Sequence, residues 1–106
     1  AGDGLQVQEI SKFPEVRRDL SLVFDRSVTF EQVKEITEEK EFSGVLREII
    51  VFDCYIGEKI GDDKKAYALG FILQDKTRTL TDKAIDRTMR RLMNKFESKL
   101  GAVIRQ

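Results

Sequence analysis

The sequence predicts an α+β fold in which two helices cover one face of a four-stranded antiparallel sheet. Two segments carry apolar residues at the three- and four-residue steps of an amphipathic helix. Three others alternate apolar and polar residues with the period of two that is typical of a strand, and a short β-branched run lies near the end. Taken in order, these segments give β-α-β-β-α-β.

The first strand is expected over residues 19–24, where alternate side chains are apolar and define a core face. These side chains are Leu20, Leu22 and Phe24. Pro14 precedes the strand, biases the residue before it toward an extended conformation and removes one backbone N–H. We therefore expect residues 12–19 at the rim of the sheet.

The first helix is expected after Thr29. Thr29 and Gln32 match the capping box, in which each side chain bonds a backbone N–H of the other residue. Apolar residues then recur at helical spacing, at Phe30, Val33 and Ile36. Glutamates at positions 31, 35, 38, 39 and 41 predict an acidic outer face.

The second and third strands are expected over residues 45–56 and 64–74, joined by a glycine- and charge-rich loop. In the second strand, the side chains expected to face the helices are Leu46, Ile50, Phe52 and Cys54. Those expected on the opposite face are Arg47, Ile49, Val51, Asp53 and Tyr55. In the third strand the apolar face consists of Tyr67, Leu69, Phe71 and Leu73.

The second helix is expected between Thr81, a good N-cap, and Gly101, which can adopt the left-handed conformation that ends a helix. Its apolar stripe consists of Ile85, Met89, Leu92, Met93, Phe96 and Leu100. Residues 102–104 form a last short strand. This order is the ferredoxin-like arrangement, with the first and third strands in the centre. The uncovered face would be a shallow platform of Ser21, Val23, Ala66, Ala68, Gly70 and Ile72.

The composition indicates one domain and disfavours several chemistries. A chain of 106 residues can bury one hydrophobic core. It contains no histidine, and its single cysteine, Cys54, is expected to pack in the core, so neither a metal site nor a catalytic residue is expected. The absence of a membrane-length apolar window and of a signal peptide predicts a cytoplasmic protein. Residues 1–10 are interpreted as an extended arm or the edge of a longer protein.

Ferredoxin-like folds host metal carriers, enzymes, sensors and RNA binders, so specific residues must separate these classes. The turn at residues 25–28 has neither the paired cysteines of a copper carrier nor a glycine-rich anion site. The two central strands lack the stacking aromatics of the common RNA-recognition motif. No constellation of residues supports a free-standing enzyme.

Two pairs of residues are candidate ligand contacts. Arg17 and Arg18 follow the stiff leader and could meet phosphates, although an ion pair with Asp19 or a loop acid is an equally good interpretation. Asp53 can accept hydrogen bonds from a base edge, and Tyr55 can stack on a base. Both residues could equally be the ordinary surface of an edge strand.

Charge is segregated along the chain, although Lys plus Arg and Asp plus Glu both number 19. Residues 76–99 are predominantly basic, and residues 25–63 are predominantly acidic. Such segregation could form an anion-binding patch, but a solvated helix face is the more ordinary interpretation. Arg78 precedes the second helix, whose free N–H groups could meet a phosphate; capping by Thr81 explains that sequence at least as well.

Several separated motifs, in the same order, resemble the ferredoxin-fold anticodon-binding domain of bacterial phenylalanyl-tRNA synthetase beta subunits. They are Ser11-Lys12-Phe13-Pro14, Arg17-Arg18-Asp19-Leu20, Phe52-Asp53-Cys54-Tyr55, Ile72-Leu73-Gln74-Asp75 and Arg78-Thr79-Leu80-Thr81-Asp82. The resemblance covers residues 11–106.

The resemblance implies a non-catalytic module that binds the anticodon stem-loop of phenylalanine tRNA. The remainder of the beta subunit and the alpha subunit would be its partners. Aminoacylation would take place on another subunit with ATP, magnesium and phenylalanine, and this domain would hold no cofactor.

The resemblance also implies roles for individual residues. Asp53 and Tyr55 match positions that meet anticodon bases. Basic residues near the RNA would be Lys12, Arg17, Arg18, Lys65 and Arg78. Ala66 stands where relatives often carry serine, so this chain lacks a polar group there.

The alternative function is a ferredoxin-like domain that senses a small molecule or dimerises through its sheet. The small residues of the central strands fit both functions. Salt dependence separates them, because an RNA binder neutralises phosphates and a sheet-to-sheet dimer does not.

Overall fold

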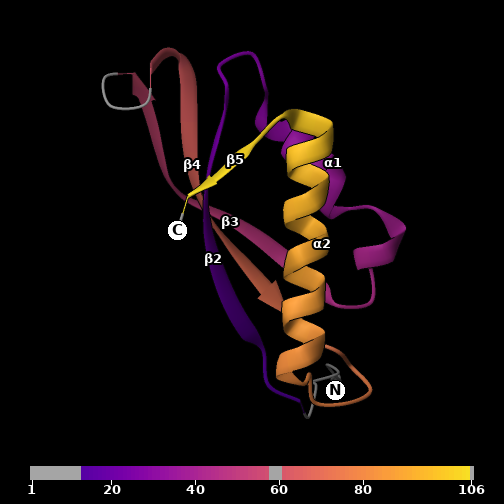
Figure 1. Ribbon diagram of the computed structural model, residues 1–106. Coiled ribbons are helices and arrows are strands. Elements are labelled where there is room, and N and C mark those ends of the chain that lie inside the picture. Colours follow the sequence, from indigo (N-terminus) through magenta and orange to yellow (C-terminus); the bar gives the residue numbers. More distant parts are fainter. Residues whose placement is uncertain (1–12, 58–60, 106) are drawn as a thin grey trace, which may run out of the picture.

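A computed structural model describes residues 13–57 and 61–105 of the 106-residue chain (Figure 1). The elements are β2 (Val16–Asp25), α1 (Phe30–Thr37), the 3-10 helix η1 (Lys40–Phe42), β3 (Leu46–Gly57), β4 (Gly61–Leu73), α2 (Asp82–Leu100) and β5 (Val103–Arg105). The predicted arm at residues 1–10 and Lys12 lie outside the described residues. In the described part of the chain, no helix is long and apolar enough to cross a membrane.

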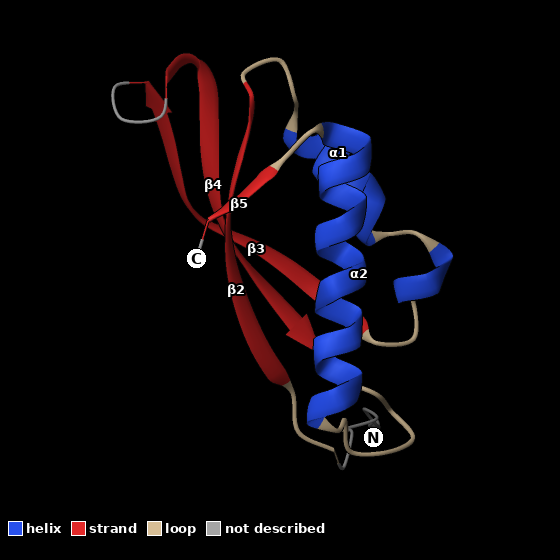
Figure 2. Ribbon diagram, viewed as in Figure 1, coloured by secondary structure: helices blue, strands red, loops and turns tan. Residues whose placement is uncertain are grey.

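The sheet has the strand order β3-β4-β2-β5, and all its pairs are antiparallel. β4 and β2 are therefore central, as predicted for the third and first strands of a ferredoxin-like fold. Both helices lie on the same side of the sheet (Figure 2). The predicted fold class is confirmed, and the other face of the sheet has no helix against it.

The core lies between the sheet and the two helices. The side chains of Leu22, Phe24, Leu69 and Phe71 are fully buried on the sheet side. On the helical side, the buried residues include Val33, Ile36, Ile85, Met89, Leu92 and Phe96. The periodicities of both central strands and both helices therefore predicted the correct core faces. Burial of this apolar surface is the main force that holds the layers together.

Both helix starts follow from their caps. The Oγ1 atom of Thr29 accepts a hydrogen bond from the backbone N–H of Gln32 at 3.3 Å, and the Gln32 side chain accepts one from the Thr29 N–H at 2.8 Å. The Oγ1 atom of Thr81 accepts from the N–H of Ala84 at 3.1 Å. Gly101 ends α2 with a φ of 65°, a conformation that costs glycine little.

The acidic outer face predicted for the first helix is confirmed at Glu31, Glu35 and Glu38, which are exposed. Glu39 and Glu41 differ, because they follow α1 and pair with lysines of α2. Glu39 accepts hydrogen bonds from Lys95 at 2.9 Å and from Lys99 at 2.8 Å, and Lys95 also pairs with Glu41 at 3.1 Å. The short helix η1 follows Glu39 and contains Glu41. Its last residue, Phe42, is buried in the core with 1% of its surface exposed. The sequence pattern did not predict η1 or the burial of Phe42.

The predicted faces of β3 are partly wrong because the strand contains register shifts, between Leu46 and Glu48 and between Val51 and Asp53. Each extra residue reverses the alternation that follows it. Ile49 and Val51 consequently stand opposite Phe71 and Leu69 on the helix side, whereas Ile50 stands opposite Gly70 on the other. After the second shift, the faces of Asp53 and Tyr55 agree with the prediction.

Cys54 also differs from its prediction. It stands opposite Tyr67, on the expected side of the sheet, but it is exposed. β3 and β4 extend as a hairpin beyond the helices (Figure 1), and Cys54 lies three residues from the end of β3 that leads into this hairpin. The expected packing of Cys54 in the core is therefore wrong.

Candidate nucleic-acid interface

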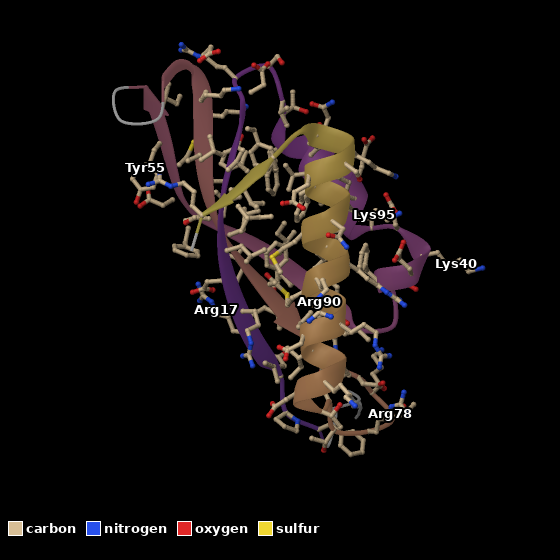
Figure 3. All side chains as sticks on the ribbon, viewed as in Figure 1. Arg17, Lys40, Tyr55, Arg78, Arg90 and Lys95 are labelled. Atoms are coloured by element: carbon tan, nitrogen blue, oxygen red, sulfur yellow. The ribbon has the colours of Figure 1, made fainter. Side chains whose placement is uncertain are left out.

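The sheet surface opposite the helices, called here the open face, is defined by strand register. Its residues are Arg17, Asp19, Ser21 and Val23 on β2, Ala66, Ala68, Gly70 and Ile72 on β4, Glu48, Ile50, Phe52, Asp53 and Tyr55 on β3, and Val103 and Arg105 on β5. Arg17 and Tyr55 both project from this side in Figure 3. The open face therefore collects aromatic, acidic and basic side chains from separate parts of the sequence.

The floor of the open face is low and its margins carry exposed apolar side chains. One row across all four strands consists of Val103, Val23, Ala66 and Tyr55. Ala66 is only 4% exposed, whereas Val103 is 60% and Tyr55 is 55% exposed. A flat ligand such as a nucleobase can approach this small-residue floor while it contacts the aromatic side chain at the margin.

Tyr55 and Asp53 hold each other in place. The Tyr55 hydroxyl donates a hydrogen bond to Oδ2 of Asp53 at 2.6 Å, and Oδ1 of Asp53 accepts from the backbone N–H of Cys54 at 2.9 Å. The hydrogen bond to the carboxylate raises the pKa of the Tyr55 hydroxyl above its ordinary value, and the nearby negative charge adds to this effect. The pair thus presents an exposed ring beside a carboxylate that has further lone pairs for N–H donors.

Arg17 lies against residues of three strands: Asp19 on its own strand β2, Gly70 on the adjacent strand β4, and Phe52 on β3. Its Nε atom donates to Oδ1 of Asp19 at 2.8 Å, the ion pair that was one of the two interpretations of this arginine. Its Cζ atom is 5.1 Å from the centroid of the Phe52 ring, a cation–π distance. We call Arg17, Asp19, Phe52 and Gly70 the Arg17 cluster.

The other predicted basic contacts lie elsewhere. Arg18 and Lys65 stand opposite the core residues Phe71 and Phe24, so strand alternation places them on the helix side of the sheet. Arg18 donates to the backbone oxygen of Arg17 at 3.0 Å. The Nζ atom of Lys65 is 5.4 Å from the centroid of the Tyr67 ring.

Arg78 lies in the loop before α2, at the end of the molecule away from Tyr55 (Figure 3). Its side chain is 80% exposed, and its Nε atom is 3.4 Å from a carboxylate oxygen of Asp75. Together with Arg87 and Arg91 it lines a hollow of about 400 Å³ beside α2. The structure therefore brings Arg17, Asp53 and Tyr55 to one face, and it leaves Arg18, Lys65 and Arg78 away from that face.

Phe52, like Ile50, lies on the open face although sequence reasoning assigned it to the helix side. It was predicted to face the helices, but 50% of its surface is exposed and it contacts Arg17 instead. The available signal was the uninterrupted apolar run of residues 49–52, which no strict alternation can accommodate. Such a run in an edge strand is compatible with a bulge.

The topology and the uncovered sheet define a class of protein: a ferredoxin-like α+β module with an open binding face. A sequence model of the ferredoxin-fold anticodon binding domain matches residues 11–105. The chain therefore belongs to the ferredoxin-fold anticodon-binding domain family. Membership of this family favours an anticodon-binding module over the alternative of a small-molecule sensor or a dimerisation domain.

Relatives of known identity carry the same segment within a longer protein. The chain is 46% identical over 98 residues to the phenylalanine–tRNA ligase beta subunit of Bacteroides fragilis, and 45% identical over 101 residues to that of Bacteroides thetaiotaomicron. It is 41% identical over 100 residues to that of Fusobacterium nucleatum. These matches cover 92%, 95% and 93% of this chain but 12% of each relative. The chain thus spans about an eighth of the length of these relatives.

Proposed function

We propose that the open face binds the anticodon stem-loop of phenylalanine tRNA, as the anticodon-binding part of a phenylalanine–tRNA ligase beta subunit. The observation that carries the proposal is the Tyr55 and Asp53 pair, fixed by its own hydrogen bond beside a floor of small residues. The partners of the module are then the tRNA, the remainder of the beta subunit and an alpha subunit, working in the cytoplasm.

Base recognition on the open face would use stacking and hydrogen bonding together. A base that stacks on an aromatic side chain gains about 1–3 kcal/mol, and Tyr55 offers more than half of its surface for this contact. Asp53 accepts hydrogen bonds only, so it favours amino or imino N–H groups on a base edge. Alanines on β4 let the base lie close to the strand backbone.

The module needs no catalytic residue and no cofactor for this function. Aminoacylation, with its ATP, magnesium and phenylalanine, belongs to another subunit in the proposal. This division of labour requires only that the module hold one end of the tRNA while the other end reacts. To hold the tRNA, the module needs affinity for it and must fix its orientation, and base stacking and charged contacts can supply both.

Basic residues would supply the salt-dependent part of the affinity. Because the whole chain carries no formal net charge, attraction for RNA depends on where individual side chains lie. Among the predicted basic contacts that the structure describes, Arg17 shares the open face with Tyr55. Lys12, Arg18, Lys65 and Arg78 stay predictions as phosphate contacts.

The test is a titration of the 106-residue chain with a labelled anticodon stem-loop of phenylalanine tRNA, at low and at higher salt. We expect weak binding that favours this stem-loop over one of unrelated loop sequence and that weakens as salt rises. Equal binding of both stem-loops would reject recognition of the anticodon. Binding that is independent of salt would reject phosphate contacts.

A further inference from the structure

The side chain of Arg17 crosses a neighbouring strand at a glycine. In the register of β2 and β4, Arg17 stands opposite Ile72, but its guanidinium lies over Gly70, two residues along β4. A Cβ atom at position 70 would lie 3.0 Å from both Nε and Nη2 of Arg17. Among the described glycines, only Gly101 has a positive φ. An alanine at position 70 would therefore press on the guanidinium and displace it by a few tenths of an ångström, whereas the backbone conformation of Gly70 does not call for glycine.

Phe52 and Asp19 also contact the guanidinium of Arg17. The register shift between Val51 and Asp53 leaves Phe52 without a partner on β4, and its ring lies 5.1 Å from Cζ of Arg17. Asp19 accepts the hydrogen bond of Nε at 2.8 Å. Within the described part of the chain, the terminal nitrogens Nη1 and Nη2 form no hydrogen bond, so their donors are available to a ligand.

We propose that Phe52 and Gly70 are positioning residues that hold the Arg17 guanidinium flat on the open face, ready to bind a backbone phosphate of the RNA. The ligand class rests on the function proposed above. A guanidinium is a planar fork of donors whose geometry matches a phosphate, and fixing it before binding reduces the entropy lost when the contact forms. Arg18 has no comparable contacts among those described, which makes it a natural comparison.

The arrangement itself is tested without RNA. In the NMR spectrum of the free chain, the Nε–H resonance of Arg17 should carry the ring-current shift of Phe52 and should be protected by its bond to Asp19. Phe52→Leu should remove the ring-current shift, and Gly70→Ala should change the resonance by displacing the guanidinium. Ile56→Ala is the matched control, because Ile56 is an exposed apolar residue of the same strand on the helix side. A resonance that neither Phe52→Leu nor Gly70→Ala changes would overturn the proposal.

The role in binding is tested by double-mutant cycles on the affinity for the anticodon stem-loop. Arg17→Ala should reduce the slope of log affinity against log salt by about 0.7, the value for one phosphate contact on a single strand. Phe52→Leu and Gly70→Ala should each reduce the affinity and the slope, and neither should do so in the Arg17→Ala background. Equal losses in both backgrounds would overturn the positioning role, since a merely structural effect does not depend on Arg17.

The two experiments separate failure of this proposal from failure of the proposed function. If the resonances respond as expected but the wild-type chain does not bind the stem-loop, the Arg17 cluster exists and the RNA ligand is wrong. If the wild-type chain binds the stem-loop and the cycles show no coupling, the function stands and the positioning role is wrong.

Discussion

The two tyrosines of the chain lie on opposite faces of the sheet, and they should respond to truncation in opposite ways. Tyr55 is 55% exposed at the margin of the open face, whereas the Tyr67 ring is in contact distance of Phe24 and Phe30, with centroids 5.8 Å and 6.1 Å away. Loss of one base-stacking contact of about 1–3 kcal/mol corresponds to an affinity loss of about 5- to 150-fold. Tyr55→Ala should show that loss for the anticodon stem-loop.

Tyr67→Ala should lower the stability of the fold more than Tyr55→Ala does. Tyr55→Ala removes an exposed ring and an exposed hydrogen bond, so the free energy of unfolding should fall by less than about 1 kcal/mol. Tyr67→Ala removes a partly buried ring and should cost about 2–3 kcal/mol, somewhat less than the truncation of a fully buried aromatic residue. Denaturant unfolding gives the stabilities, and fluorescence anisotropy with the labelled stem-loop gives the affinities. Unchanged affinity in Tyr55→Ala, or a stability loss as large as that of Tyr67→Ala, would refute the assignment of Tyr55 to a binding surface.

Three further predictions concern stability. Hydrogen bonds from Lys99 and Lys95 lower the pKa of Glu39 in the folded chain below its ordinary value of 4.5. The ionised Glu39 therefore contributes its full stabilisation above pH 4.5, and this stabilisation is lost as the pH falls through the lowered pKa of the folded state. Glu39→Gln should therefore lower the thermal midpoint at about pH 7, and its difference from wild type should shrink as the pH falls below 4.5; a difference that stays constant with pH would contradict this. Gly101→Ala should cost about 1 kcal/mol in urea unfolding because of the left-handed φ, and no loss would mean that the helix end rearranges. Thr29→Ala should cost about 1 kcal/mol through its cap, whereas Thr29→Ser should cost less; equal costs would exclude the hydroxyl as the cause.

The order of elements and most of the core could be predicted because they follow from local patterns. Leu20, Leu22 and Phe24 alternate without interruption, and the structure buries all three. The capping residues Thr29 and Thr81 start helices within a residue of the predicted positions. Each of these features depends on neighbours in the sequence, so the sequence alone is sufficient to place it.

The errors occur where a distant strand decides the outcome. The faces of Ile49, Ile50 and Phe52 depend on register shifts against β4, which no local alternation encodes. Burial of Phe42 depends on how the segment after α1 packs, and the burial of hydrophobic residues in short helices has no periodic signal. The candidate site was predictable in part for the same reason: Asp53 and Tyr55 were assigned to the correct face, but the contact between Arg17 and Phe52 joins residues 35 positions apart in the chain.

Lys65 shows a further limit of the same kind. It is two residues from Tyr67 on the same strand, so alternation alone places both on the helix side of the sheet. A contact from Lys65 to RNA on the open face would have to reach around the β3–β4 hairpin. The basic residues implied by resemblance therefore separate into Arg17, which shares the open face with Tyr55, and the others in the described chain, which do not.

The most direct test of the open face as the binding surface is a chemical-shift map of the chain titrated with the anticodon stem-loop of phenylalanine tRNA. We predict that the largest changes fall on residues of the open face, with Asp53, Tyr55 and Arg17 among them, while the outer surface of α2 stays unchanged. Changes concentrated on α2 and the Arg78 loop, with the open face unaffected, would contradict the account.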